Sequence, residues 1–256
     1  MSRKALVAAI VILLAISVTA SAMLPEPAIN KRGANTPGLE KIVFIHYKKG
    51  AKPPWAGSGK SKSTCYDFLG KGVKWRALPI SYIVNPDNGD DLDESYVTAA
   101  IHSAAEEWDN HTSTELFSDV FFIDYSATWD GDAPDGRNEM VFDYYPDSNV
   151  IAVTVVWGYF TGPPSAREIR EFDILFNDNY LWGNADPDND GNAENTGVMD
   201  LQNIATHELG HGIGLDDLYE DVCYMETMYG YSDYGEVIKR DLNTGDIAGL
   251  HELYGE

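Results

Sequence analysis

One motif fixes the local fold around it: the segment His207-Glu208-Leu209-Gly210-His211. Two imidazoles four residues apart face the same side of the chain when they lie on an α-helix, one turn apart, and there they can share one metal ion. In a chain with only six His, chance would give on the order of 0.01 such matches. Asp200 can cap the start of the helix. Apolar residues before the motif give the predicted helix a buried face: Leu201, Ile204, Ala205 and Leu209.

The residues beside and after the motif complete the predicted site. Glu208 projects next to the imidazoles, where its carboxylate can take a proton from a metal-bound water. Two histidines leave a tetrahedral zinc ion short of a protein ligand. Gly214 can adopt positive φ and end the helix, so that the chain turns back and Asp217 offers a carboxylate oxygen. Asp216 is a neighbouring alternative, which the spacing disfavours.

The pattern H-E-x-x-H-x-x-G-x-x-D at residues 207–217 resembles the metzincin metalloproteases, and within them the matrixin-like group, over most of residues 75–256. Aspartate in place of the usual third histidine resembles the snapalysin-type variant. The resemblance implies a zinc endopeptidase that cleaves peptide bonds of proteins or peptides by a metal-activated water, with Glu208 as the general base. It also implies an α+β, zincin-like fold, in which a twisted mixed sheet of about five strands accompanies a long first helix, an active-site helix and a C-terminal helix.

Three further segments carry the resemblance. Residues 226–231 look like the turn whose methionine lies under the zinc, and Met228 is the matching residue. Residues 244–255 resemble the final helix of matrixins. Residues 171–177 resemble the sheet-edge strand along which substrate peptides extend. A histidine-bound second zinc and the cysteine-containing pro-segment motif of many matrixins have no counterpart in this sequence.

Between the N-terminal region and the motif, hydrophobic patterning predicts one helix over residues 92–108, with a single apolar face. Runs rich in Val, Ile, Tyr and Phe, each bounded by Asp, Asn, Gly or Pro, predict the strands. Their ranges are 80–84, 140–145, 150–159 and 171–176, with a weaker candidate at 120–125.

The first 22 residues have the pattern of a secretory signal, with two basic residues, an apolar run and then Ala20-Ser21-Ala22. An uncleaved membrane anchor is the alternative, and in either case the remaining chain would lie outside the cytoplasm. Residues 23–64 are rich in Pro, Gly and Lys, which indicates a linker or pro-segment in which only residues 42–45 could form a short strand. Residues 65–256 are then the expected metallopeptidase domain.

The net charge of −23 argues against nucleic acid as a partner. The charge is unevenly distributed: residues 23–76 carry +8 and residues 77–256 carry −33. One hypothesis is therefore a zymogen whose basic arm, residues 31–62, lies over an acidic cleft until it is removed. A monomer is expected. A non-catalytic, metal-stabilised binding domain remains an alternative function, although a purely structural site would need no general base at Glu208.

Two further predictions concern stabilising sites. Cys65 and Cys223 are the only cysteines, and an exported protein with an even count most simply pairs them. Asp186, Asp188 and Asp190 have the spacing that begins a calcium loop, but Gly197 stands where a bidentate glutamate should close it. Calcium at this turn is therefore an expectation beside the alternative of a solvated acidic turn.

Overall fold

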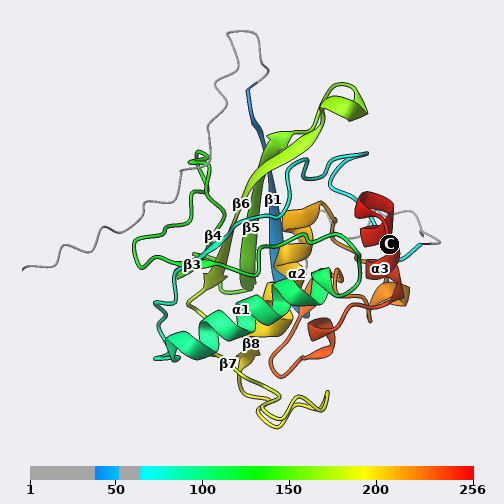
Figure 1. Ribbon diagram of the computed structural model, residues 1–256. Coiled ribbons are helices and arrows are strands. Elements are labelled where there is room, and N and C mark those ends of the chain that lie inside the picture. Colours follow the sequence, from blue (N-terminus) through cyan, green and yellow to red (C-terminus); the bar gives the residue numbers. More distant parts are fainter. Residues whose placement is uncertain (1–37, 52–63) are drawn as a thin grey trace, which may run out of the picture. The chain divides into compact units, whose positions relative to one another are not determined.

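The computed structural model describes residues 38–51 and 64–256, all of which belong to one compact unit that spans residues 35–256. Its centre is a mixed seven-stranded sheet with the order β3-β2-β4-β6-β5-β1-β9 (Figure 1). The strands are β1 (Glu40–Lys48), β2 (Ile83–Val84), β3 (Phe122–Ile123), β4 (Glu139–Asp143), β5 (Val150–Tyr159), β6 (Glu168–Asn177) and β9 (Tyr231–Ser232). Strands β7 (Trp182–Gly183) and β8 (Met199–Asp200) pair separately.

Within the described residues, three α-helices accompany the sheet: α1 (Glu94–Asp109), α2 (Leu201–Ile213) and α3 (Thr244–Tyr254). Short 3-10 turns lie at η1 (Pro164–Ala166), η2 (Asp221–Cys223) and η3 (Ile238–Arg240). The predicted α+β class, with a mixed sheet, a long first helix, a motif helix and a C-terminal helix, is confirmed. The sheet is larger than the expected five strands, because β1 and β9 extend it beyond β5.

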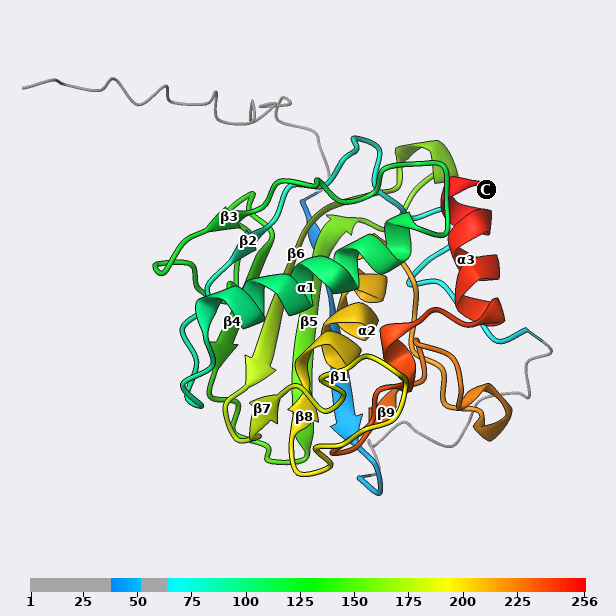
Figure 2. The same cartoon turned by 60° about the horizontal axis from the view of Figure 1, so that its bottom comes forward.

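Helices α1 and α2 pack side by side over the same face of the sheet (Figure 2). The buried face of α1 includes Val97, Ile101, Ala104 and Trp108, as its apolar spacing predicts. The Trp108 indole Nε1 donates a 2.9 Å hydrogen bond to the Thr206 carbonyl of α2. Burying each large apolar side chain at this contact contributes about 1.5–3 kcal/mol, so α1 fixes the position of the motif helix.

Strand directions correct one expectation about the sheet. Strands β3, β2, β4 and β6 run parallel, whereas β5 is antiparallel to β6 and β1 is antiparallel to β5. Residues 171–177, expected to form a sheet-edge strand, belong to β6, which lies between β4 and β5. The expectation was wrong because edge status depends on strand order, which the local sequence of a strand does not specify.

Part of the N-terminal region expected to be a linker or pro-segment forms regular structure. Residues 40–48, expected within a linker or pro-segment, form a nine-residue strand integral to the sheet. Lysines near both ends of this strand hide its alternation of buried and exposed positions in the sequence, so only residues 42–45 were expected to be extended. The predicted signal at residues 1–22 lies outside the described residues, as do residues 23–37 and 52–63 of the predicted linker.

A disulfide joins Cys65 to Cys223, two residues 158 positions apart, as their number and the expected compartment suggested. Beside it, residues of the same N-terminal stretch pair with the chain after α2, since Phe68 forms a β-bridge with Leu215. Residues 64–73 are thus fastened to the body of the unit. No helix within residues 38–51 and 64–256 combines the length and apolar character needed to cross a membrane.

Candidate metal centre

The motif helix α2 begins and ends where the sequence predicts. The Asp200 side chain accepts a hydrogen bond from the Asn203 amide at 2.9 Å and so caps the first turn. Gly214 follows the last helical residue with φ of 115°, a left-handed conformation that glycine adopts without a Cβ clash. This turn redirects the chain so that Asp217 returns to the side of the helix that bears His207 and His211.

Three ligand atoms from this segment converge. The two Nε2 atoms of His207 and His211 are 3.2 Å apart. Asp217 Oδ1 lies 3.3 Å from the first and 3.6 Å from the second. The structure therefore brings together all three residues predicted as ligands, whereas Asp216 instead donates its backbone amide to the Asp67 carbonyl.

Hydrogen bonds at the outer imidazole nitrogens orient these side chains. His207 Nδ1 lies 2.7 Å from the Thr227 carbonyl and His211 Nδ1 lies 3.0 Å from the Leu215 carbonyl. Because a carbonyl only accepts, both Nδ1 atoms carry hydrogen, so each ring has a lone pair on Nε2 whenever it is neutral. Second partners of this kind are typical of metal-binding histidines.

The spacing of the three atoms fits a zinc ion. Ligands held 2.0–2.1 Å from one tetrahedral ion lie about 3.3 Å from each other. The two Nε2 atoms and the Asp217 carboxylate oxygen are buried close to one another, so together they attract a cation or a shared proton. The donor set of two imidazoles and one carboxylate also leaves a fourth position, as catalytic zinc sites require.

Charge and burial act against each other at these side chains. Burial lowers the pKa of His207 to about 4. Burial disfavours charge on His211 too, but the carboxylates of Asp217 and Glu208 outweigh it and raise the pKa of His211 to about 9. Burial disfavours the charged form of Asp217 as well, yet the two imidazoles hold its pKa well below the usual range. Burial thus favours neutral side chains at this centre, whereas the attraction between Asp217 and His211 favours their charged forms.

Glu208 lies beside this group and is completely buried. Burial raises its pKa, although the two imidazoles and a hydrogen bond from Thr154 work in the opposite direction. The Thr154 hydroxyl of β5 donates to Oε2 over 2.5 Å. His46 Nδ1 of β1 lies 3.0 Å from Oε1 and donates to it, because a carboxylate oxygen only accepts.

The turn that contains Met228 packs against the motif helix at Gly210. Asp246 of α3 accepts hydrogen bonds from the backbone amides of Thr227 and Met228, at 2.7 and 3.1 Å, and fixes this turn. A Cβ atom on Gly210 would overlap the Met228 sulfur and the Trp108 ring, so glycine is required for the helix to approach the turn. The turn thereby supports the helix directly behind the two histidines.

Two side chains at this centre were not predicted from the sequence. Thr154 lies in the apolar run 150–159, where nothing marks one threonine as special. His46 belongs to the segment expected to be a linker or pro-segment, more than 150 residues from the motif in sequence. The alternation Ile42, Phe44, His46 was the available signal, since it puts the histidine on the inward face of an extended chain.

The turn that was expected to bind calcium also brings several carboxylates close together. Asp186, Asp188 and Asp190 lie close together and are joined by Glu194, with one carboxylate oxygen of each within 4.8 Å of the others. Asp186 is buried and accepts the backbone amides of Asp190 and Gly191, at 3.2 and 2.9 Å. Calcium binding at this turn stays a prediction.

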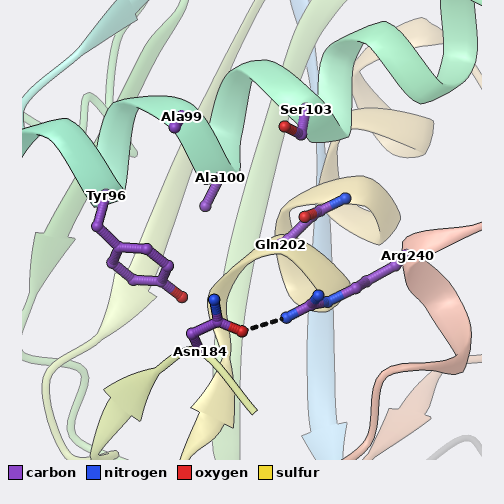
Figure 3. Close-up of a pocket in the computed structure, with 7 residues that line it drawn as sticks. All are labelled: Tyr96, Ala99, Ala100, Ser103, Asn184, Gln202 and Arg240. Atoms are coloured by element: carbon purple, nitrogen blue, oxygen red, sulfur yellow. Dashed lines mark hydrogen bonds between the residues drawn. The ribbon is translucent and has the colours of Figure 1, made fainter. Parts of the chain in front are cut away.

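A pocket outside the metal group lies between α1 and the start of α2 (Figure 3). It is lined by Tyr96, Ala99, Ala100, Ser103, Asn184, Gln202 and Arg240. None of the predicted metal or catalytic residues contributes to this lining.

Comparisons with known proteins place this centre in a family. The family model of matrixins matches residues 74–255. Matrix metalloproteinase-16 of Mus musculus is 28% identical over 207 residues, covering 78% of this chain and 30% of that protein. Matrix metalloproteinase-16 of Homo sapiens is 28% identical over 192 residues, covering 72% and 28%. The chain spans less than a third of the length of these relatives. The family match includes the whole of the motif helix, the Met228 turn and α3. The chain therefore belongs to the matrixin family.

Proposed function

We propose that this chain is a zinc-dependent endopeptidase in which His207, His211 and Asp217 hold one zinc ion and Glu208 is the general base. The observation that carries the proposal is the convergence of three ligand atoms, at separations of 3.2 to 3.6 Å, beside a buried carboxylate in a chain of the matrixin family. Proteins or peptides are the substrates that follow from this assignment.

Zinc bound by these residues supplies a Lewis acid that makes water a nucleophile near neutral pH and polarises a peptide carbonyl. Glu208 accepts the proton of the attacking water and later delivers a proton to the leaving amine. Thr154 holds Oε2, so Oε1 is the oxygen free to exchange protons once its contact with His46 is broken. The raised pKa of Glu208 suits this role, because a stronger base takes the proton more readily.

We also propose that the protein is secreted, with membrane attachment through an uncleaved N-terminal segment as the alternative. The signal pattern in residues 1–22 supports export, and the Cys65–Cys223 disulfide is of the kind that persists in oxidising compartments. N-terminal sequencing of the exported protein tests this. A protein that begins near Met23 supports secretion, whereas one that retains residues 1–22 and sediments with membranes supports the anchor.

The function is tested by measuring zinc content and casein hydrolysis on the same preparations. Glu208→Gln should retain zinc and lose about 10²–10⁴-fold in kcat/KM, the usual contribution of a positioned general base. Asp217→Asn should lose zinc, and Asp216→Asn is its matched control with zinc retained. Chelation should abolish hydrolysis by the wild type.

Two results would contradict the proposal. Undiminished hydrolysis by Glu208→Gln would remove this carboxylate from the mechanism. A wild type that binds zinc but cleaves no substrate would favour the non-catalytic binding domain.

A further inference from the structure

The end of helix α1 carries an acceptor pattern for N-linked glycosylation, in which asparagine is followed two residues later by serine or threonine. The pattern is Asn110-His111-Thr112, and no other asparagine of the sequence has it. Such a pattern receives a glycan only where the asparagine lies on the protein surface. The position and contacts of these three residues therefore decide whether the pattern can be used.

Asn110 is exposed and points away from the motif helix. It follows Asp109, the last residue of α1, and its φ of −63° and ψ of −16° continue the right-handed helical geometry. Two residues earlier, Trp108 is 0% exposed and donates its hydrogen bond to Thr206 of α2. Side chains two positions apart on a helix point in directions about 200° apart. The contact that fastens α1 to α2 thus directs Asn110 to the opposite side, toward solvent.

The side-chain amide of Asn110 has no structural task among the described residues. Its backbone amide donates to the Glu106 carbonyl at 2.8 Å, but its side chain has no hydrogen-bond partner within residues 38–51 and 64–256. The asparagines that end helices by their conformation adopt a left-handed backbone, whereas Asn110 is right-handed. Its Nδ2 atom is therefore available for a covalent bond, and the loss of the side chain would break no contact.

The other two residues of the pattern are held by contacts that do not involve the asparagine. His111 Nε2 lies 3.0 Å from Glu107 Oε1, and the His111 carbonyl accepts a 2.7 Å hydrogen bond from His251 Nε2. The Thr112 hydroxyl donates to the Gly255 carbonyl at 2.9 Å. Residues 110–114 lie outside the helices and strands. This segment can therefore keep its conformation with a bulky group on its first residue.

The surroundings of the segment leave room for such a group. The end of α1 lies beside residues 254–256, as both views show and as the bond from Thr112 to Gly255 requires (Figures 1 and 2). Ser113, Gly255 and Glu256 are all exposed. A substituent on Asn110 would extend from this surface, on the side of α1 that faces away from α2 and its two histidines.

We propose that Asn110 is a glycosylation site that carries an N-linked oligosaccharide in the exported protein. The sugar donor is an oligosaccharide joined through phosphate to a lipid. The Asn110 Nδ2 atom forms a bond to the first carbon of the sugar while the bond from that carbon to the phosphate oxygen breaks. The lipid phosphate leaves with the electron pair, Nδ2 loses one proton to the transferase, and nothing is oxidised or reduced.

The proposal rests on the proposed secretion, because N-linked glycans are attached to exported chains. It does not rest on zinc binding or peptide hydrolysis. The modification adds a bulky, hydrophilic group to the surface, and we expect it to cover the end of α1 and the neighbouring residues 254–256.

The test uses the full chain, with its own residues 1–22, produced in cells that N-glycosylate exported proteins. A known exported glycoprotein is made beside it as a positive control. The intact mass of the purified protein is measured, and its peptides are sequenced by mass spectrometry. The variants are Asn110→Gln and Thr112→Ala, which destroy the pattern, and Thr112→Ser, the matched control that keeps both the pattern and a hydroxyl.

The wild type and Thr112→Ser should have a mass above that of the polypeptide, and the excess should map to the peptide that contains Asn110. Asn110→Gln and Thr112→Ala should have the mass of the bare polypeptide. If Thr112→Ala loses its cooperative thermal transition, Asn110→Gln decides the comparison, because its side chain makes no contact to lose. An unmodified Asn110 in exported wild type, beside a glycosylated positive control, would overturn the proposal, as would an excess mass that persists in Asn110→Gln.

Failure of secretion is distinguishable from failure of the glycosylation site. Wild type that stays inside the cells would contradict the proposed secretion. In that case the chain with residues 1–22 replaced by the signal peptide of the positive control is exported, and the state of its Asn110 decides the proposal in the same way.

Discussion

Arg240 is buried against Asp200, the residue that caps the start of the motif helix, and replacing Arg240 should show how much this contact stabilises the protein. The guanidinium forms a two-point contact with the Asp200 carboxylate, from Nε to Oδ1 at 2.9 Å and from Nη2 to Oδ2 at 2.6 Å. It also donates to Asn184 Oδ1 at 2.8 Å, as Figure 3 shows, and to the Asp186 carbonyl at 3.0 Å. Asp200 is 0% exposed and Arg240 is 6% exposed.

Arg240→Met removes the positive charge but keeps an apolar chain of similar reach. Breaking a buried ion pair from one side costs about 3–5 kcal/mol, because the remaining charge is left uncompensated in the interior. Asp200 would still accept backbone amides from Asn203 and Ala185, at 2.9 and 2.8 Å, which partly satisfy it. We therefore expect a loss near the lower limit, about 3 kcal/mol, a large fraction of the 5–15 kcal/mol that typically stabilises a domain.

The measurement is urea unfolding followed by tryptophan fluorescence, with zinc in constant excess. Adding Asp200→Asn to Arg240→Met should recover at least about 1 kcal/mol, because the amide removes the buried charge while its oxygen can still cap the helix. Arg170→Met is the control, since Arg170 is exposed and forms only a 3.4 Å contact with Glu168, for which the expected effect is below about 1 kcal/mol. The reasoning is refuted if Arg240→Met is no more destabilising than Arg170→Met, or if Asp200→Asn deepens the loss.

Three other predictions concern stability. Replacing Cys65 and Cys223 by serine should lower the free energy of unfolding by about 5 kcal/mol, the loop-closure entropy expected for two residues 158 positions apart. A loss below about 1 kcal/mol in urea unfolding would contradict this entropic origin of the stabilisation. Burial raises the pKa of Asp173 to about 8, so the contribution of this side chain to stability falls as pH rises from about 4 to 8. Asp173→Asn should therefore raise the melting temperature more at pH 8.5 than at pH 5. An equal gain at both pH values would argue against this titration. Mild calcium depletion with zinc retained should lower the melting temperature if the turn at residues 186–194 binds calcium, and no change would favour a solvated acidic turn.

The sequence predicted the motif region to within a few residues because its determinants are local. A helix places residues four apart on one face, so His207 and His211 converge wherever α2 packs. The cap at Asp200 and the left-handed Gly214 depend on neighbours within the same few residues. Val150–Tyr159 was likewise predicted at its full length, because a continuous apolar run between polar turns indicates a buried strand.

The order of the strands was decided only by the tertiary structure. The sequence of β6 is compatible with an edge or an interior position, and its place between β4 and β5 follows from pairings with residues 9 to 34 positions away. The same limit applies to β1, whose partner strand lies about 110 residues further along the chain. Hydrophobic patterning gives the face that a strand buries, but it does not give the neighbour with which the strand pairs.

The sequence by itself therefore determined the chemistry of this protein: the two imidazoles, the aspartate, the glutamate and the helix that presents them. Only the tertiary structure decided that His46 and Phe44 contact these side chains and that Thr154 donates a hydrogen bond to the glutamate. The physical reason is the range of the interactions involved. Helix geometry is fixed by hydrogen bonds between residues four apart. Strand pairing instead joins segments that are far apart in the sequence, and the local sequence of a strand does not specify which segment pairs with it.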